Sequence, residues 1–435
     1  MARHLKTASG SASDAPDLVG VPDRVREIIA EVSATGDQAV RKFSTEFDGH
    51  ERDTFRLSET EIHDAMARVP DQTLADIRTV QENVRRFAQL QRESIRDFES
   101  EVDPGVILGQ KNIPITSVGA YVPGGRYPLL ASAHMTILTA KVAGVSRVIG
   151  TTPAPKGVLP DASVAAMHLA GADEIYALGG VQAIAAMAIG TQTIAPVDFL
   201  CGPGNAFVAE AKRQMYGRVG IDLFAGPTEV LILSDGSADP FLVAVDLLSQ
   251  AEHGPDSPAI LITTDETQGA EVITEVDRQL ESLSTASIAR PAWKNFGEVI
   301  LADDLDEAYR IADQFASEHV QVLTSDPRHA LERLQNYGAL FLGDKTCVSY
   351  GDKVIGTNHV LPTRGAARYT GGLWVGKFLK TVTYQEVTTS QATAELGELL
   401  GRSARAENFE GHARAGDLRV ARARGEHLSW APERF

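Results

Sequence analysis

The sequence of 435 residues is poor in cysteine, with only Cys201 and Cys347. Two cysteines cannot form the disulfide framework of a small secreted domain, and neither lies in a CxxC motif, so both are interpreted as packing residues in a reducing compartment. Long hydrophobic runs are also absent: there is no stretch of about 18 apolar residues, and MARHLKTASGSASDAPD lacks the apolar core of a signal peptide. These absences predict a soluble, cytoplasmic protein without a membrane partner.

Positive charge is scarce relative to negative charge. The chain has 41 lysines and arginines against 58 aspartates and glutamates, a formal net charge of −17 at pH 7. Proteins that bind nucleic acids usually present a basic surface, so this balance argues against a nucleic-acid partner and favours a small-molecule one. Hydrophobic residues make up 43% of the sequence, and the length is sufficient for two or more domains with substantial cores.

Residues 1–112 have mainly helical patterns. Ser58 and Glu61 have the spacing of a capping box, and a long amphipathic stripe follows at Leu74, Ile77, Val80, Val84, Phe87 and Leu90. This N-terminal segment is expected to pack on the core and on a partner subunit, and no chemistry is predicted for it.

Residues 113–235 and 236–378 each alternate short apolar runs with helical patterns. This alternation predicts an α/β fold with two doubly wound, Rossmann-like halves and a cleft between them. The dinucleotide fingerprint GxGxxG is missing from both halves. Glycine-rich turns at 123–125, 179–180 and 202–204 would let backbone approach a ligand, although tight strand-to-helix turns explain them equally well.

One stretch of the second half, DPFLVAVDLLSQAEHGPDS, combines helix signals with polar side chains. Asp239 can cap a helix that begins with Pro240, and Phe241, Val245 and Leu248 are expected to form its apolar face. Gln250 and His253 would then project together near its end. Alone, this pair favours an ordinary surface helix over a metal site.

After residue 343 the alternation stops. Residues 344–372, rich in Gly, Asp, Asn, His and Arg, predict a functional loop, since loops of this length in compact proteins are usually functional or disordered. Residues 379–435 predict a helical C-terminal tail.

Six strings resemble the histidinol dehydrogenase family in order and spacing: YVPGG, GPGNAFVAEAKRQ, AGPTEVLI, DLLSQAEHGPDS, SEHV and GDKVIGTNHVLPT. The resemblance covers about residues 20–420. It implies two incomplete Rossmann-like domains with helical termini, and a homodimer whose active sites are shared between subunits. It also implies NAD as oxidant, one zinc ion per subunit, and oxidation of a primary alcohol through a bound aldehyde to a carboxylate.

The resemblance identifies four zinc ligands. They are Gln250, His253, Asp352 and, contributed by the C-terminal tail of the partner subunit, His412. Imidazole and carboxylate are ordinary zinc ligands, whereas an amide oxygen is a weak neutral one. For His412 a purely structural role stays open, because the match in the tail is shorter.

Two adjacent residues match the family's acid–base pair. His319 would take the hydroxyl proton while hydride leaves for NAD, and Glu318 would activate water against the aldehyde. The alternative is a pair that only terminates a helix. Other positions match family residues that contact ligands: Tyr121, Gln182 and Asn205 for NAD, and Thr228, His359 and Glu407 for substrate.

The sequence departs from the histidine-making members at two positions. Val348 stands where those members usually have a glutamate that faces the substrate amine, and Arg364 follows LPT where a neutral residue is common. With Arg126 and His134, this pattern resembles a subgroup that oxidises 2,3-dihydroxypropane-1-sulfonate to 3-sulfolactate. We expect that sulfonate as substrate; oxidation of L-histidinol to L-histidine is the alternative, and a non-catalytic zinc- and nucleotide-binding relative is the remote one.

Overall fold

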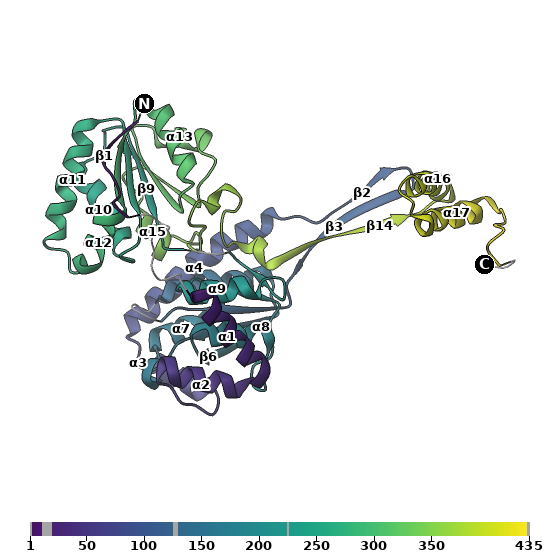
Figure 1. Cartoon of the computed structure of the whole chain (residues 1–435), viewed down its shortest axis with the longest axis horizontal. Helices are drawn as coiled ribbons and strands as arrows, with labels where there is room; N and C mark the ends of the chain where they lie inside the picture. The colour runs from purple at the N-terminus through teal and green to yellow at the C-terminus, as the bar shows by residue number, and fades with distance from the viewer. Residues whose placement is uncertain (1, 11–19, 125–128, 224–225, 433–435) are drawn as a thin grey trace. The chain divides into compact units, whose positions relative to one another are not determined.

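The computed structural model describes residues 2–10, 20–124, 129–223 and 226–432, and the chain divides into two compact units (Figure 1). The first comprises Met1–Arg92 and Ile115–Phe378, and the second comprises Glu93–Pro114 and Leu379–Phe435. In the described part of the chain, no helix combines the length and apolar character needed to cross a membrane.

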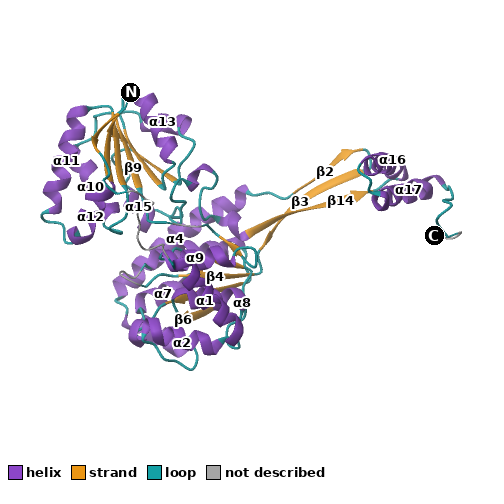
Figure 2. Cartoon of the chain, viewed as in Figure 1, coloured by secondary structure: helices purple, strands orange, loops and turns teal. Residues whose placement is uncertain are grey.

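The first unit contains a five-stranded parallel sheet with helices on both faces (Figure 2). Its strand order is β6-β5-β4-β7-β8, so β4 is central and the order reverses there. The strands are β4 (Ser117–Tyr121), β5 (Arg147–Thr152), β6 (Glu174–Ala177), β7 (Phe199–Cys201) and β8 (Gly220–Ile221). The helical segments after β4 are α5 (Leu130–Ala133), η2 (His134–Leu138), α6 (Thr139–Ala143), α7 (Asp161–Leu169), α8 (Gly180–Ile189) and α9 (Ala206–Met215).

A second, six-stranded sheet repeats this order. Its parallel strands are arranged β11-β10-β9-β12-β13, and β1 (Arg3–Lys6) adds an antiparallel edge. Its strands are β9 (Val230–Ser234), β10 (Ala259–Thr263), β11 (Gly297–Leu301), β12 (His319–Leu323) and β13 (Ala339–Leu342). The two doubly wound halves predicted from the sequence are confirmed.

The apolar run of β9 explains why the second sheet is covered on both faces. Val230 and Ile232 face a core formed with α10 (Pro240–Ala251), α11 (Glu266–Leu280) and α12 (Ala286–Phe296). Leu231 and Leu233 face the opposite core, formed with α13 (Leu305–Phe315) and α14 (Ala330–Arg333). Alternate side chains on both faces are therefore buried, as in a parallel strand of an α/β protein.

Helix α10 begins as predicted but buries a different face. The Asp239 side chain accepts a hydrogen bond from the Phe241 backbone N–H, and Pro240 occupies the first turn. Phe241 and Val245, however, are 51% and 41% exposed. The segment PFLVAVDLL is apolar on nearly every side, so its spacing does not select a face. Packing on the sheet buries Val243, Ala244, Leu247 and Leu248.

The N-terminal segment includes strands as well as the expected helices. Helices α1 (Val21–Thr35) and α2 (Asp37–Asp48) pack on α8, and α3 (Glu59–Arg68) begins with the predicted capping box at Ser58 and Glu61. Helix α4 (Asp71–Ser94) buries Ile77 and Val84, whereas Phe87 and Leu90 of the predicted stripe are exposed.

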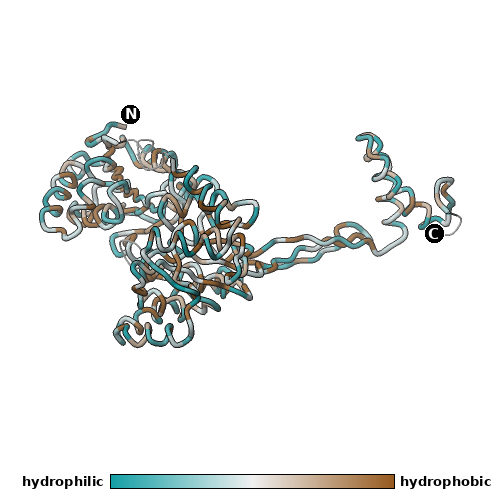
Figure 3. The backbone as a smooth tube through the Cα atoms, turned by 60° about the horizontal axis from the view of Figure 1, so that its bottom comes forward, coloured by the Kyte–Doolittle hydropathy of each residue, from teal (hydrophilic) through white to brown (hydrophobic). Residues whose placement is uncertain are grey.

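The second unit has a three-stranded antiparallel sheet and two helices. Strands β2 (Phe98–Asp103) and β14 (Leu379–Val387) flank β3 (Val106–Pro114). Nearly every residue of β14 is exposed, and hydrophobic residues are interspersed along the strands (Figure 3). Helices α16 (Ser390–Ala406) and α17 (Glu410–Arg424) approach closely where Gly397 meets Gly416. The tail after residue 379 is thus a strand followed by helices.

Candidate active site

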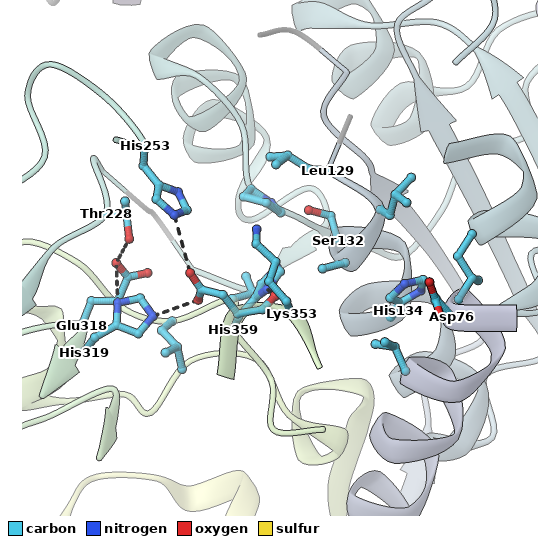
Figure 4. A pocket seen from close by; sticks show the side chains of 18 of the residues that line it. Asp76, Leu129, Ser132, His134, Thr228, His253, Glu318, His319, Lys353 and His359 are labelled. Atoms are coloured by element: carbon cyan, nitrogen blue, oxygen red, sulfur yellow. Dashed lines mark hydrogen bonds and ion pairs between the residues drawn. The ribbon is translucent and has the colours of Figure 1, made fainter. Parts of the chain in front are cut away.

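A cavity of about 470 Å³ lies at the amino ends of β9 and β12. Helix α4, the end of α10, the segment after β4 and the loop after α15 (Val348–Lys353) contribute its walls. Figure 4 shows His253, Glu318 and His319 together on one side of it, and His134 and Asp76 on the other. Ligand sites in doubly wound sheets usually lie at the carboxyl ends of strands, so this position departs from the rule.

His319, the first residue of β12, is the buried imidazole at the centre of this cluster. Its Nδ1 lies 3.0 Å from the backbone oxygen of Glu229, so in the neutral ring Nδ1 carries the proton and Nε2 is basic. Nε2 lies 3.3 Å from Asp352 Oδ1. Burial alone lowers the pKa of His319, but the carboxylates of Glu318 and Asp352 outweigh burial and hold that pKa well above its ordinary value. The two carboxylates therefore stabilise the imidazolium that forms when Nε2 takes up a proton.

Glu318 is held by hydrogen bonds from the segment that precedes β9. Its Oε2 accepts from Thr228 Oγ1 at 2.5 Å and from the Glu229 backbone N–H at 3.0 Å. The Glu318 backbone N–H in turn donates to Glu229 Oε1 at 3.2 Å. Burial and the nearby Glu318 carboxylate raise the pKa of Glu229 to about 7. The Glu229 carboxyl can therefore exchange a proton near neutral pH beside the His319 imidazole.

Three of the four predicted metal ligands lie in this region. His253 Nε2 is 3.6 Å from Asp352 Oδ2, and the buried Gln250 amide contacts Thr228 Oγ1 and lies 3.5 Å from His319 Nδ1. Burial alone raises the pKa of Asp352, but the His319 imidazole lowers it by a larger amount, so the net pKa is well below the ordinary value. The carboxylate therefore stays ionised, as a metal ligand must.

These residues are suitable zinc ligands, but they do not complete the coordination of the ion. Across the described ranges, no three His, Cys, Asp or Glu side chains are grouped to hold a metal. His253 and Asp352 supply two such ligands and Gln250 a neutral oxygen, so one strong ligand is needed from elsewhere. The predicted fourth ligand, His412, is exposed in the second unit, where its ring contacts Phe409.

A second cavity, of about 650 Å³, brings together the three residues predicted to contact NAD. Tyr121 ends β4, where the strand order reverses, and its hydroxyl accepts from the Gly180 N–H at 3.2 Å. Burial raises the pKa of Tyr121 to about 12, so the hydroxyl keeps its proton. Asn205 caps α9 by accepting from Phe207 and Val208 N–H groups at 3.1 Å.

The buried amide of Gln182 indicates that this cleft binds a polar ligand. The side chain is fully buried, yet its amide oxygen and nitrogen have no hydrogen-bond partner within the part of the chain that is described. Buried amides are costly to leave unpaired, so a ligand that fills the cleft would satisfy them. The cleft lies at the carboxyl ends of β4 and β7, and α9 begins there, which suits a dinucleotide.

The remaining predicted substrate residues have different positions. Thr228, His359 and His134 line the 470 Å³ cavity. The Nδ1 of His134 lies 3.1 Å from the Gln81 amide nitrogen, and burial lowers the pKa of His134 to about 4, so this ring is neutral. Arg364 is exposed and does not line the cavity, although its side chain lies against Gly226, which does. Glu407 is exposed in the second unit, and Arg126 lies outside the described residues.

Val348 belongs to the apolar core beneath the second sheet. It is 1% exposed and packs in the cluster that contains Phe341 and Val230. Asp352, one helical turn later on α15, reaches the cavity, whereas Val348 does not line it. No carboxylate is therefore available at this position.

Sequence reasoning missed three residues near these sites. Asp76 on α4 and Lys353 line the 470 Å³ cavity, and Asp48 lines the 650 Å³ cavity. Lys353 had a signal in the sequence, because it directly follows Asp352. Asp76 and Asp48 lie on ordinary amphipathic helices that carry no motif.

Buried acid–base groups at the strand ends of a doubly wound sheet are typical of an α/β enzyme. Comparison with known proteins then specifies the family: the histidinol dehydrogenase profile matches residues 13–420. The chain belongs to the histidinol dehydrogenase family of oxidoreductases, as the resemblance predicted.

Three relatives span nearly the whole chain. A histidinol dehydrogenase homolog of Shouchella clausii is 58% identical over 97% of this chain and 99% of its own length. The sulfopropanediol 3-dehydrogenase of Ruegeria pomeroyi is 48% identical over 96% of each chain. The crystal structure of histidinol dehydrogenase from Elizabethkingia anophelis matches with a TM-score of 0.90 and 33% identity, over 96% of this chain and 95% of that one.

Proposed function

We propose that the protein oxidises a primary alcohol through a bound aldehyde to a carboxylate, with NAD as the oxidant of both steps. The arrangement of His319 carries this proposal: Nδ1 is engaged by the Glu229 carbonyl, so Nε2 takes the hydroxyl proton while hydride passes to NAD. In the second step, Glu318 removes a proton from the water that attacks the aldehyde. Hydride then passes to a second NAD, and the carboxylate product forms.

Gln250, His253 and Asp352 would hold zinc together with His412 of a second copy of the chain. Zinc would supply Lewis-acid polarisation of the substrate oxygen. A shared site is supported by the incomplete ligand set of the first unit and by the exposure of His412 and Glu407. The exposed hydrophobic residues of β2, β3 and β14 are consistent with a homodimer, because such a surface is usually covered.

The substrate we propose is 2,3-dihydroxypropane-1-sulfonate, with 3-sulfolactate as product. The absence of a carboxylate at Val348, where histidine-making members usually have a glutamate that faces the substrate amine, supports it. The 48% identical relative named sulfopropanediol 3-dehydrogenase supports it as well. L-Histidinol is the second candidate, because Asp76 lines the cavity and its carboxylate could receive an ammonium.

A substrate panel followed by NADH absorbance tests the proposal. Purified enzyme with zinc and NAD is given the sulfonate or histidinol, and NADH formed per alcohol consumed is determined. We expect two NADH per sulfonate molecule and kcat/KM at least about 10²-fold above that for histidinol, since an unpartnered charge in a site costs about 3–5 kcal/mol. A preference for histidinol would refute the substrate, and one NADH per alcohol would refute the double oxidation.

A further inference from the structure

The substrate cavity contains one strongly basic side chain among the described residues that line it. The acidic lining residues are Asp76, Glu318 and Asp352, and the histidines are His134, His253, His319 and His359. Lys353 is the sole lysine or arginine in that part of the lining. Any positive charge that the described walls offer independently of imidazole protonation therefore comes from Lys353.

Within the described ranges, the ammonium group of Lys353 has no ion-pair partner. Among the described residues, no carboxylate oxygen lies within 4.0 Å of its Nζ. Lys141 and Lys212, by contrast, are paired with Asp173 and Asp222. Lys353 is itself exposed, and its side chain lines a cavity that a ligand must fill (Figure 4).

The backbone on both sides of Lys353 is held in place. The Asp352 carbonyl oxygen lies 2.8 Å from His359 Nδ1, and the Val354 carbonyl accepts from Asn83 Nδ2 at 2.8 Å. The backbone that carries the Lys353 side chain is therefore fixed between α4 and the loop after α15. A fixed backbone removes part of the conformational freedom that the lysine would otherwise lose when it binds an anion.

Lys353 directly follows Asp352, which contacts His319 and His253. When the hydroxyl of a short alcohol reaches that cluster, a substituent a few bonds from the hydroxyl would lie near Lys353. A short alcohol with an anionic end group matches this spacing. Lysine binds sulfonate, carboxylate and phosphate oxygens as a compact point charge.

Building on the proposed function, we propose that Lys353 binds the anionic end group of the alcohol substrate and determines its charge class. Arg364, the cation expected from the sequence, is exposed outside the cavity lining, and His134 is neutral at physiological pH. Lys353 thereby selects an oxyanion over an ammonium at the end distant from the reacting hydroxyl.

The test compares the native enzyme with Lys353→Met, Lys353→Arg and, as a matched control, Lys345→Met. Lys345 is exposed on the segment preceding α15 and does not line the cavity. Steady-state kinetics are measured with 2,3-dihydroxypropane-1-sulfonate, glycerate, glycerol 3-phosphate, neutral glycerol and histidinol. Zinc content is determined for each variant, because Lys353 adjoins a proposed zinc ligand.

We expect Lys353→Met to lower kcat/KM for the sulfonate roughly 10- to 100-fold, mainly through KM, as for a lost charged hydrogen bond. Lys353→Arg should stay within about tenfold of the native enzyme because it keeps the charge. Glycerol turnover, zinc content and the Lys345→Met enzyme should be unchanged.

The other possible outcomes distinguish a failure of the proposed substrate from a failure of the proposed role of Lys353. An unchanged sulfonate KM in Lys353→Met, or an equal loss with glycerol, overturns the role of Lys353 alone. If the native enzyme ignores the sulfonate but oxidises another anionic alcohol, and Lys353→Met loses that activity, the sulfonate is wrong and Lys353 stands. A native preference for histidinol over every anionic alcohol, or failure to oxidise any of them, overturns both.

Discussion

The buried ion pair between Lys212 and Asp222 supports the turn that separates the two cavities. Removing this ion pair should lower the free energy of unfolding. Both side chains are at most 4% exposed. Lys212 Nζ also donates to the Gly202 carbonyl at 2.9 Å, and Asp222 accepts from the Gly202 and Leu223 N–H groups at 2.8 and 2.7 Å. The pair therefore fixes the turn at residues 202–204, whose Pro203 lines both cavities.

We expect Lys212→Met to lower the free energy of unfolding by about 3–5 kcal/mol, because it leaves the Asp222 carboxylate buried without its cation. At about 2 °C per kcal/mol for a domain of this size, the melting temperature should fall by about 6–10 °C. The double variant Lys212→Met/Asp222→Asn removes the stranded charge while keeping one acceptor for the turn. It should recover at least about half of the loss.

Urea denaturation and thermal unfolding of the metal-free protein measure these changes. Lys141→Met is the control, because its pair with Asp173 is partly exposed and should contribute less than about 1 kcal/mol. At a temperature where the variant is folded, KM for NAD should rise, since the displaced turn precedes Asn205. A Lys212→Met protein as stable as Lys141→Met would refute the reasoning.

Three further predictions concern the active site. Chelation or His253→Ala should abolish bound zinc and activity together, as measured by metal analysis and NADH formation; full activity of metal-free enzyme would contradict the ligand assignment. His319→Ala should slow oxidation roughly 10²–10⁴-fold as expected for a lost general base, whereas Glu318→Gln should impair the aldehyde step more, so that aldehyde accumulates in a trapping assay; equal effects on both steps would argue against the division of roles. Burial lowers the pKa of His134 from its ordinary value to about 4, so the folded protein binds fewer protons than the unfolded chain between about pH 4 and 6.5, and stability should be lost as the pH falls through that window. The loss attributable to this ring is at most about 3 kcal/mol, and urea titrations of metal-free His134→Gln at pH 7 and 4.5 should show a correspondingly smaller decline than the native protein.

The sequence by itself determined the architecture and most candidate groups. Strand-length apolar runs that alternate with helical patterns can be buried only in parallel sheets covered on both faces, and both sheets have this form. Helix-capping residues act on their own chain neighbours, so Asp239, Ser58 and Glu61 were predictable locally. The family motifs predict His253, His319 and Asp352 as site residues, and Asp352 lies 3.6 Å from His253 and 3.3 Å from His319.

Only the tertiary structure decided which of these side chains meet. Phe241 and Val245 are exposed because an almost wholly apolar helix takes its buried face from the sheet it packs on. Val348 and Asp352 lie on one short helix, yet one enters the core and the other the cavity. Asp76, His134 and Lys353 are far apart in sequence and line one cavity because the packing of α4 and two separate sheets brings them together. Such long-range approaches depend on three-dimensional packing, which local periodicity does not encode.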